Sequence, residues 1–342
     1  MYCLMEFFNE PIRDLIAKNV DIDKNFKYEQ FKVGRSNITF KVFDKENTYV
    51  LRRPPYGDKL ESAHNMSREY KIIDVLSKNK IKVPKPIFLY KDKKVCDDDF
   101  YVMEYIKGET IATNIEAEKY SKEDKEKISE SFIETISTIH NFDVINSELS
   151  DLGKHEGYVE RQLNRWNKQF EAQKVREIKE LDLATKLLFE NIPKQQRVCI
   201  VHGDYRLDNV RVNNGSVAAV LDWELCTIGD PLADLGTIIA SWSNPEEEET
   251  PFIYSPSLAG GFSSRNELIK LYESKTDLSI NDIEFYTRLS YWKHAMIMEG
   301  VYVRYSHGSY GKVDEKEIEL FKQSTLMFAK KAANKNLIKE IT

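Results

Sequence analysis

Two short segments near the middle of the chain constrain its fold more than any other feature. They read VHGDYRLDNV at residues 201–210 and VLDWE at residues 220–224. Asp204 follows a His-Gly pair, Asn209 lies five residues further on, and Asp222 stands where the next strand is expected to end. A carboxylate that can take a proton, together with amide and carboxylate oxygens that suit Mg²⁺, predicts a catalytic loop beside a metal site.

The spacing of this aspartate and asparagine is typical of the catalytic loop of protein kinases. In such a loop Asp204 would orient a substrate hydroxyl group and accept its proton, whereas Asn209 and Asp222 would bind Mg²⁺. His-Gly-Asp alone arises by chance, so the inference rests on both segments together. His202 is expected to be a packed structural histidine, and Glu224 either contacts a second metal ion through water or faces solvent.

A third segment, GDPLADLG at residues 229–236, follows the second aspartate. Pro231 suits a first helical turn, and Asp230 is expected to cap that helix rather than to take part directly in catalysis. Asp234 lies one turn into the helix. We expect its carboxylate to accept backbone N–H groups of the loop at residues 202–204 and to hold that loop rigid.

The N-terminal third of the chain shows the period-two alternation of strands and one clear helical pattern. β-branched and aromatic residues alternate with polar ones between turn residues, which predicts five strands. A helix with Ser62 as its cap is expected to pack on the sheet, and a short helix is expected earlier, at residues 9–18. The strands are expected at residues 28–33, 38–43, 48–52, 87–90 and 100–105, and the packed helix at residues 62–77.

The rest of the chain has mainly helical patterns, in which apolar residues recur every three or four positions. The expected fold class is therefore α+β, a two-lobed, protein-kinase-like fold with a small five-stranded antiparallel lobe and a larger, mainly helical lobe. Residues 1–105 would bind nucleotide, and residues 106–342 would carry the catalytic and substrate-binding groups. The long helices are expected at residues 121–139, 159–172, 181–191, 281–305 and 314–335.

Composition argues against several classes of partner. The formal charge of −6 comes from 56 acidic and 50 basic residues interleaved along the chain, so nucleic acid is not expected. No apolar run approaches the length of a membrane span, and no membrane partner is expected. The four cysteines are scattered without metal-binding spacing, which favours reduced thiols and a cytoplasmic protein. No pattern indicates an oligomeric state.

Together these motifs resemble the aminoglycoside phosphotransferase and choline kinase superfamily, whose fold is similar to that of eukaryotic protein kinases. The resemblance covers nearly the whole chain. It is closest to the phosphotransferase domain that occurs alone in many bacteria and fused to acyl-CoA dehydrogenases in animals. The matching segments are FKVGRSNITF at residues 31–40, LRRPP at 51–55, SAHNMSREY at 62–70, and the two catalytic segments with their extension to residue 236.

The resemblance implies a nucleotide site in the first lobe, for ATP or GTP with Mg²⁺. Arg52 would stand where such kinases carry a phosphate-binding lysine, with Glu69 as its partner. Arg53 is an alternative for the first role, and a surface carboxylate is the alternative for Glu69. Ser36 and Asn37 would form a turn and reach the phosphates.

Backbone groups at the junction of the two lobes, around Glu104 and Ile106, would bind the adenine by the same resemblance. The acceptor side is less defined. Arg161 and Arg165, four apart on one helix face, could clamp a carboxylate or phosphate. Trp242 and Trp292 complete the first choice of acceptor-cleft residues. Further candidates are Trp166, Tyr291, His294 and Arg304, although aromatic residues at helical spacing usually pack in a core.

The function expected from these residues is an ATP- and Mg²⁺-dependent transfer of the γ-phosphate to a hydroxyl group of a small metabolite. The fused relatives direct the acceptor toward a hydroxyacyl compound. One alternative is an aminoglycoside or other antibiotic phosphotransferase. A second is a nucleotide-binding pseudokinase with a regulatory role, against which the complete set of Asp204, Asn209 and Asp222 counts.

Overall fold

The computed structural model describes residues 7–31, 37–55, 65–247, 249–307 and 314–341. The chain divides into two compact units, each of which is assembled from separate segments. The first unit contains residues 1–109 and 218–225, and the second contains residues 110–217 and 226–342. The predicted division at residue 105 did not include the return of residues 218–225 to the first unit. The assignment of nucleotide and substrate to separate lobes stays a prediction.

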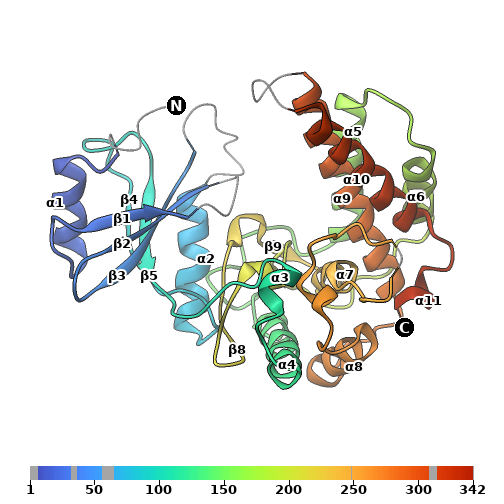
Figure 1. Ribbon diagram of the computed structural model, residues 1–342, viewed down its shortest axis with the longest axis horizontal. Helices are drawn as coiled ribbons and strands as arrows, with labels where there is room; N and C mark the ends of the chain where they lie inside the picture. Colours follow the sequence, from blue (N-terminus) through green and yellow to red (C-terminus); the bar gives the residue numbers. More distant parts are fainter. Residues whose placement is uncertain (1–6, 32–36, 56–64, 248, 308–313, 342) are drawn as a thin grey trace. The chain divides into compact units, whose positions relative to one another are not determined.

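A five-stranded antiparallel sheet forms the centre of the first unit, as the alternation predicted (Figure 1). Its strand order is β1-β2-β3-β5-β4, with the middle strand β3 paired to β2 and β5. The strands are β1 (Lys27–Gln30), β2 (Ile38–Phe43), β3 (Thr48–Arg53), β4 (Pro86–Tyr90) and β5 (Phe100–Glu104). The first strand ends earlier than expected, and residues 32–36 lie outside the described residues.

Two helices cover the faces of this sheet. Helix α1 (Glu10–Asn19) buries Ile12 and Ile16 in an apolar cluster that includes Phe40 and Leu51. Because side chains alternate along a strand, Leu51 and its neighbours at odd positions of β3 face this cluster, whereas Arg52 faces the other side. The expected leading helix therefore also packs on the sheet.

Helix α2 (Met66–Lys78) packs against β4 and β5. Its cap is Asn65, whose side chain accepts the Arg68 N–H at 2.9 Å. An Asn at this position satisfies one of the otherwise unpaired donors of the first turn. The expected cap, Ser62, lies outside the described residues.

Residues 218–225 attach to the first unit through backbone and side-chain contacts. The Val220 N–H donates to the Lys82 carbonyl at 2.8 Å, and the short 3₁₀ helix η2 (Trp223–Leu225) packs against α2. This return explains why Asp222, which lies far from the sheet in sequence, belongs to the same unit as Arg52.

The second unit is mainly helical, as predicted (Figure 1). Two small sheets accompany its helices: β6 (Cys199–Val201) with β9 (Thr227–Gly229), and β7 (Val210–Asn213) with β8 (Ser216–Val220). The helices are α3 (Asn114–Ala117), α4 (Lys122–His140), α5 (Tyr158–Gln173), α6 (Lys179–Glu190), α7 (Leu232–Ser241), α8 (Arg265–Thr276), α9 (Ile283–Ser306), α10 (Glu315–Ala333) and α11 (Leu337–Ile341). None of the helices within the described ranges is both long and apolar enough to cross a membrane.

Helix α7 begins after Asp230, whose carboxylate accepts the Leu232 N–H at 3.0 Å. This bond confirms the capping role predicted for Asp230. The helix then packs so closely on α9 that a Cβ atom at Gly236 would overlap the backbone of Tyr286. The absence of a side chain at Gly236 therefore sets the approach of the two helices.

Gly236→Ala tests this close approach. In an ordinary helix interior, replacing Gly by Ala stabilises by about 0.5–1 kcal/mol. Here we expect the opposite sign, a loss of about 1–3 kcal/mol in the free energy of unfolding, because the added methyl group meets backbone atoms that must shift. Urea unfolding of the purified protein measures the change.

Gly300→Ala in α9 is the matched control. The nearest atom to its added Cβ would be Arg304 Nη1 at 3.4 Å, the far end of a flexible side chain. We expect this variant to keep or gain stability. Equal stabilisation by both substitutions would show that α7 and α9 move apart at little cost to admit the added methyl group.

Candidate functional site

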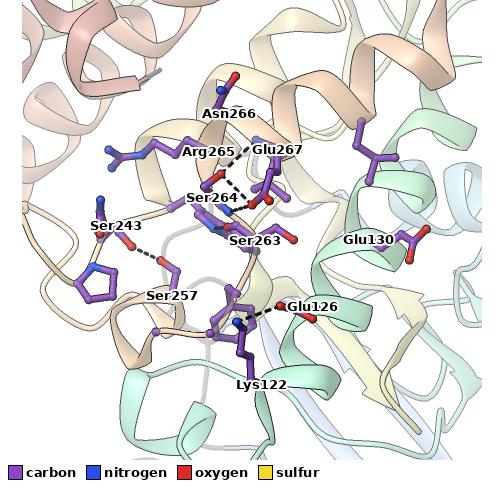
Figure 2. A pocket seen from close by; sticks show the side chains of 18 of the residues that line it. Lys122, Glu126, Glu130, Ser243, Ser257, Ser263, Ser264, Arg265, Asn266 and Glu267 are labelled. Carbon is purple, nitrogen blue, oxygen red and sulfur yellow. Dashed lines mark hydrogen bonds and ion pairs between the residues drawn. The ribbon is translucent and has the colours of Figure 1, made fainter.

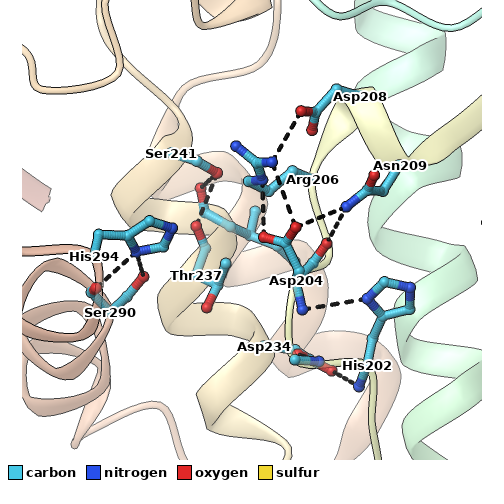
Figure 3. A network of polar contacts seen from close by, with 12 residues as sticks. His202, Asp204, Arg206, Asp208, Asn209, Asp234, Thr237, Ser241, Ser290 and His294 are labelled. Atoms are coloured by element: carbon cyan, nitrogen blue, oxygen red, sulfur yellow. Dashed lines mark hydrogen bonds and ion pairs between the residues drawn. The ribbon is translucent and has the colours of Figure 1, made fainter. Parts of the chain in front are cut away.

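The loop after β6 is fixed by one buried carboxylate. Asp234, which is fully buried on α7, accepts the His202 N–H at 2.7 Å and the Gly203 N–H at 2.8 Å (Figure 3). Both bonds were predicted from the spacing of the motifs, and both are confirmed. Gly203 has a φ of 86°, a conformation that glycine adopts without steric cost.

Asp234 has further support from behind. His140 on α4 lies with its Nε2 at 3.2 Å from the carboxylate, and its Nδ1 is 2.6 Å from the Tyr272 hydroxyl group. Burial raises the pKa of Asp234. The hydrogen bond and electrostatic interaction with His140 oppose this effect, helped by His202 and the Gly203 N–H, and the pKa is lowered overall. The carboxylate is therefore an ionised anchor for the loop.

His202 itself is fully buried, and its Nδ1 accepts the Asp204 N–H at 3.3 Å. Its ring lies edge-on to Tyr205 at 5.9 Å between centroids. These contacts fit the structural role expected for His202. The side chain uses one ring nitrogen to shape the turn that presents Asp204.

Asp204 is held by two neighbours from the same loop. Arg206 Nε lies 2.9 Å from its Oδ1, and Asn209 Nδ2 donates to its Oδ2 at 2.9 Å and to its backbone carbonyl at 2.8 Å (Figure 3). Arg206 also pairs with Asp208 at 3.0 Å. These bonds fix the direction of the Asp204 carboxylate.

The electrostatic environment keeps Asp204 charged. Burial raises the pKa of Asp204, but the positive charge of Arg206, to which Lys293 adds, lowers it by more, so the pKa lies below the ordinary value. A carboxylate with a low pKa is a weak base. It orients a hydroxyl group well and takes its proton late in the reaction.

Helix α9 contributes two residues to the same area. Lys293 Nζ donates to the Gly203 carbonyl at 3.0 Å, so the Gly203 peptide is held on its N–H side by Asp234 and on its carbonyl side by Lys293. His294 donates from Nδ1 to the Ser290 carbonyl at 2.8 Å. Burial, with the charge of Arg206, lowers the pKa of His294 to about 4, so its ring is neutral at pH 7.

A second charged cluster lies in the first unit, around Arg52. Its guanidinium bonds Glu69 on α2 at 3.1 Å, contacts Asp222 directly, and lies 3.5 Å from Glu224. The pairing of Arg52 with Glu69 agrees with the sequence expectation. Tyr101 adds a hydrogen bond to Glu69 from the neighbouring strand.

Arg53 lies on the opposite face of β3. It is 3% exposed, pairs with Asp98 at 2.6 Å and lies over the Phe7 ring at 4.3 Å. Alternation along the strand thus gives the two arginines different neighbours. Arg52 is the one that shares a cluster with Asp222.

Three carboxylates, those of Glu69, Asp222 and Glu224, surround the Arg52 guanidinium. Burial raises the pKa of Glu69 and the field of Asp222 adds to this effect, while Arg52 opposes both. Asp222 has a φ of 63°, a left-handed conformation that few residue types other than glycine adopt and that aspartate tolerates. Glu224 does not face solvent freely, since Asn37 Nδ2 donates to it at 2.9 Å.

Within the described ranges, no group of three or more His, Cys, Asp or Glu side chains is arranged as a complete metal site. Mg²⁺ does not need one, because it usually binds through one or two carboxylates together with substrate phosphates and water. Asp222, whose side chain is 33% exposed, fits that mode of binding.

The other four expected nucleotide-binding residues are Ser36, Asn37, Glu104 and Ile106. Ser36 lies outside the described residues, and Asn37 is buried beside Glu224. The Glu104 N–H is already used, because it donates to the Lys85 carbonyl at 2.9 Å. Ile106 is half-buried in the irregular segment that follows β5.

The four expected acceptor residues do not come together. Arg161 donates to the Lys154 carbonyl at 2.8 Å, whereas Arg165 lies over the Trp166 ring at 5.4 Å. Trp292 is fully buried, and its indole N–H donates to Thr185 at 2.7 Å, so it packs in the core.

Trp242 lines a different pocket. Its indole N–H donates to the Ser263 carbonyl at 2.8 Å, and the pocket, of about 930 Å³, is lined by charged and small polar residues of α4 and of the segment before α8 (Figure 2). None of the catalytic-loop residues lines it. Trp242 therefore lies apart from Asp204.

Three residues that contact the catalytic loop or its anchor were not predicted from the sequence: Arg206, Lys293 and His140. Arg206 had a signal, since it stands between Asp204 and Asp208 in the catalytic segment. Lys293 and His140 had none. Each lies on a long helix far from the motif in sequence, and only the packing of that helix brings it to the loop.

The fold has many counterparts among solved structures. A protein from Ralstonia eutropha provisionally described as an aminoglycoside phosphotransferase superposes with a TM-score of 0.81 at 30% identity, covering 97% of this chain and 98% of that one. Choline kinase from Cryptosporidium parvum gives a TM-score of 0.65 at 17% identity, with 96% of both chains covered. An ADP-bound aminoglycoside phosphotransferase gives 0.58 at 18% identity, with 92% and 96% covered. The chain thus has a protein-kinase-like α+β fold.

The sequence comparison is more specific. Residues 27–253 match the phosphotransferase enzyme family, and the chain belongs to that family. Human acyl-CoA dehydrogenase family member 11 is 34% identical over 292 residues, which is 83% of this chain and 37% of that protein. Mouse acyl-CoA dehydrogenase family member 10 is 31% identical over 287 residues, which is 80% of this chain and 26% of that protein. This chain therefore corresponds to a minor part of those relatives.

Asp234→Asn tests the anchor of the loop. The amide keeps one acceptor oxygen but loses the charge, so one buried N–H of His202 or Gly203 loses its partner. We expect a loss of about 1–3 kcal/mol in the free energy of unfolding at pH 7, measured in urea. Asp182→Asn, at an exposed position on α6, is the control and is expected to change stability by less than about 0.5 kcal/mol.

The pH dependence has a defined sign. The pKa of Asp234 is lower in the folded protein than the value of about 3.9 in an unfolded chain. The contribution of its charge is therefore complete above pH 3.9 and is lost as the pH falls through the folded-state pKa. A difference between wild type and variant that already vanished at pH 6 would contradict the assignment of the anchor.

Proposed function

We propose that the chain is an ATP- and Mg²⁺-dependent kinase that transfers the γ-phosphate to a hydroxyl group of a small metabolite. One observation carries the proposal: an ionised Asp204 is held in a single direction by Arg206 and Asn209, on a loop that Asp234 fixes from below. Phosphoryl transfer depends mainly on alignment and charge neutralisation, and this loop supplies alignment for the attacking oxygen.

Asp204 accepts a hydrogen bond from the acceptor hydroxyl and directs its lone pair at the phosphorus. Because its pKa is low, the proton moves to the carboxylate late, as the new P–O bond forms. Arg206 keeps the carboxylate in place and offers positive charge beside it. The loop is preorganised, which lowers the entropic cost of reaching the reactive geometry.

In the first unit, Arg52 is the candidate for contact with the nucleotide phosphates, with Glu69 holding it in position. The three carboxylates around Arg52 would repel a polyphosphate. This cluster therefore favours a nucleotide that binds together with a divalent cation. Asp222 would hold Mg²⁺, with Asn209 as the second predicted ligand. The ion would supply charge neutralisation to the phosphates.

The acceptor class follows from relatives and not from the site alone. Acyl-CoA dehydrogenase family members match most of this chain with their own phosphotransferase region. This association supports a hydroxyacyl compound, either as the free acid or as its coenzyme A thioester. Solved relatives bound to ADP share only the fold, and they support a nucleotide as the donor.

Asp204→Asn tests the catalytic role. Transfer of labelled γ-phosphate from ATP into a metabolite extract measures turnover, and calorimetry measures MgATP affinity. We expect turnover to fall by about 10²–10⁴-fold, because the amide cannot accept the proton, while nucleotide affinity stays unchanged. A labelled small molecule made by wild type and lost in the variant would also give the product for identification.

Asp208→Asn is the matched control, since Asp208 lies four residues away and also pairs with Arg206. We expect it to retain activity within a few-fold. A variant of Asp204 as fast as wild type would remove this residue from catalysis. Wild type that binds MgATP and labels no product would favour the pseudokinase.

Asp222→Asn tests the metal role, and asparagine is chosen because it also tolerates the left-handed backbone found here. We expect ATP binding to lose most of its dependence on Mg²⁺, because one of the carboxylates around Arg52 is gone. Calorimetric titration with ATP is compared in magnesium and in EDTA. An affinity for MgATP equal to that of wild type would refute the assignment of Asp222 as a metal ligand.

A further inference from the structure

Two cations of the second unit share one aromatic ring beside the catalytic loop. Arg165 lies with its Cζ 5.4 Å from the centre of the Trp166 ring, and Lys293 Nζ lies 5.8 Å from the same ring. Both distances are within the range of a cation–π interaction. Trp166 and Arg165 are on α5, and Lys293 is on α9, so two helices bring the charges together.

Neither cation has a carboxylate partner in the described part of the chain. Among the described residues, no acidic side chain lies within ion-pair distance of Arg165 or Lys293, and the hydrogen-bond acceptor of Lys293 is the neutral Gly203 carbonyl. Burial lowers the pKa of Lys293. The positive charges of Arg165 and Arg206 lower it further, in spite of the fields of Asp204 and Asp234. The folded protein thus holds the Lys293 charge at a cost in free energy.

Trp166 and Lys293, but not Arg165, line a narrow pocket that reaches the loop, and Asp234, whose carboxylate accepts the His202 and Gly203 N–H groups, lines it as well. The pocket has a volume of about 30 Å³, and Trp166, Gly203, Ser290 and Lys293 are among its lining residues. The Trp166 Nε1 atom is buried and makes no hydrogen bond to the protein. A space of this size admits one water-sized group, so an oxygen atom of a ligand can enter and find a donor.

We propose that Lys293 and Arg165, around the Trp166 ring, form the binding site for an anionic group of the phosphate acceptor. An oxyanion there would pair with Lys293 and meet the Trp166 indole N–H, and the exposed Arg165 would add its charge from outside the pocket. The acceptor is therefore a hydroxylated compound with a carboxylate or a phosphate, and not a polycation. The inference rests on the proposed function, because it names the substrate class of the same site.

The anion site lies close to the catalytic residue Asp204. Lys293 bonds the carbonyl of Gly203, the residue directly before Asp204, and successive Cα atoms are about 3.8 Å apart. An anion at Lys293 and a hydroxyl group at Asp204 can therefore belong to one short molecule. The apolar face of Trp166 offers contact to the carbon chain that joins them.

The test uses acceptors that differ only in charge. Hydroxy fatty acids with the hydroxyl at the second, third or fourth carbon are compared with their neutral methyl esters and with their coenzyme A thioesters. For Lys293→Met, which keeps the apolar stem, we expect the KM of the anionic acceptor to rise by about tenfold or more. The KM for the neutral ester and for ATP should stay unchanged. Arg165→Met, at an exposed position, should give a smaller shift of the same kind.

Lys168→Met is the control, since Lys168 is an exposed cation on the same helix as Trp166. If Lys293→Met raises the KM of the free acid, the bound anion is a carboxylate. If it raises only the KM of the thioester, the bound anion is a phosphate of coenzyme A. Because Lys293 also bonds the Gly203 carbonyl, we expect kcat to fall for every acceptor, so KM decides. An equal rise of KM for charged and neutral acceptors would show that Lys293 only holds Gly203, and the inference is overturned.

A binding measurement separates this inference from the proposed kinase activity. Calorimetry with the hydroxy acids, the thioesters and inorganic phosphate is done on wild type, Lys293→Met and Lys168→Met. Anion binding that is lost only in the Lys293 variant supports the site even if no acceptor is phosphorylated. Wild type that binds none of these anions overturns the inference, whatever the activity.

Discussion

The arrangement of the catalytic loop depends on one buried carboxylate. Asp234 accepts two consecutive backbone N–H groups of the loop, and a buried ionised group is tolerable only when its hydrogen bonds are satisfied. His140 supplies the remaining contact and is itself bonded to Tyr272. Because α7 carries Asp234 and packs tightly on α9 at Gly236, the position of the loop follows from the packing of two helices.

The charged groups that gather in the two units have opposite signs. Around Arg52, three carboxylates gather on one guanidinium in the first unit. Around Trp166, two cations have no carboxylate partner within the described part of the chain, so this part of the second unit lacks negative charge. A metal-bound nucleotide would complement the first cluster, and an anionic acceptor would complement the second.

Local patterns predicted those features that depend on short stretches of sequence. Alternation in β3 placed Arg52 and Arg53 on opposite faces, and the spacing from the loop to α7 predicted the bonds of Asp234. Helix α8 was missed although its capping box, Ser264 with Glu267, is visible in the sequence. The return of residues 218–225 to the first unit depends on a contact with Lys82, which no local pattern encodes.

Lys293 shows why the acceptor side resists prediction. Helix α9 has buried residues on nearly every side, so periodicity marks no single face as facing the site. The tryptophans that looked most suitable have their indole N–H groups satisfied inside the second unit, whereas the unsatisfied one is Trp166. Relatives of the same fold act on or bind chemically different acceptors, as the choline kinase and aminoglycoside phosphotransferase likenesses show. A shared fold therefore cannot select the acceptor, and the charge that this chain leaves unpaired beside Asp204 is the more direct physical guide to it.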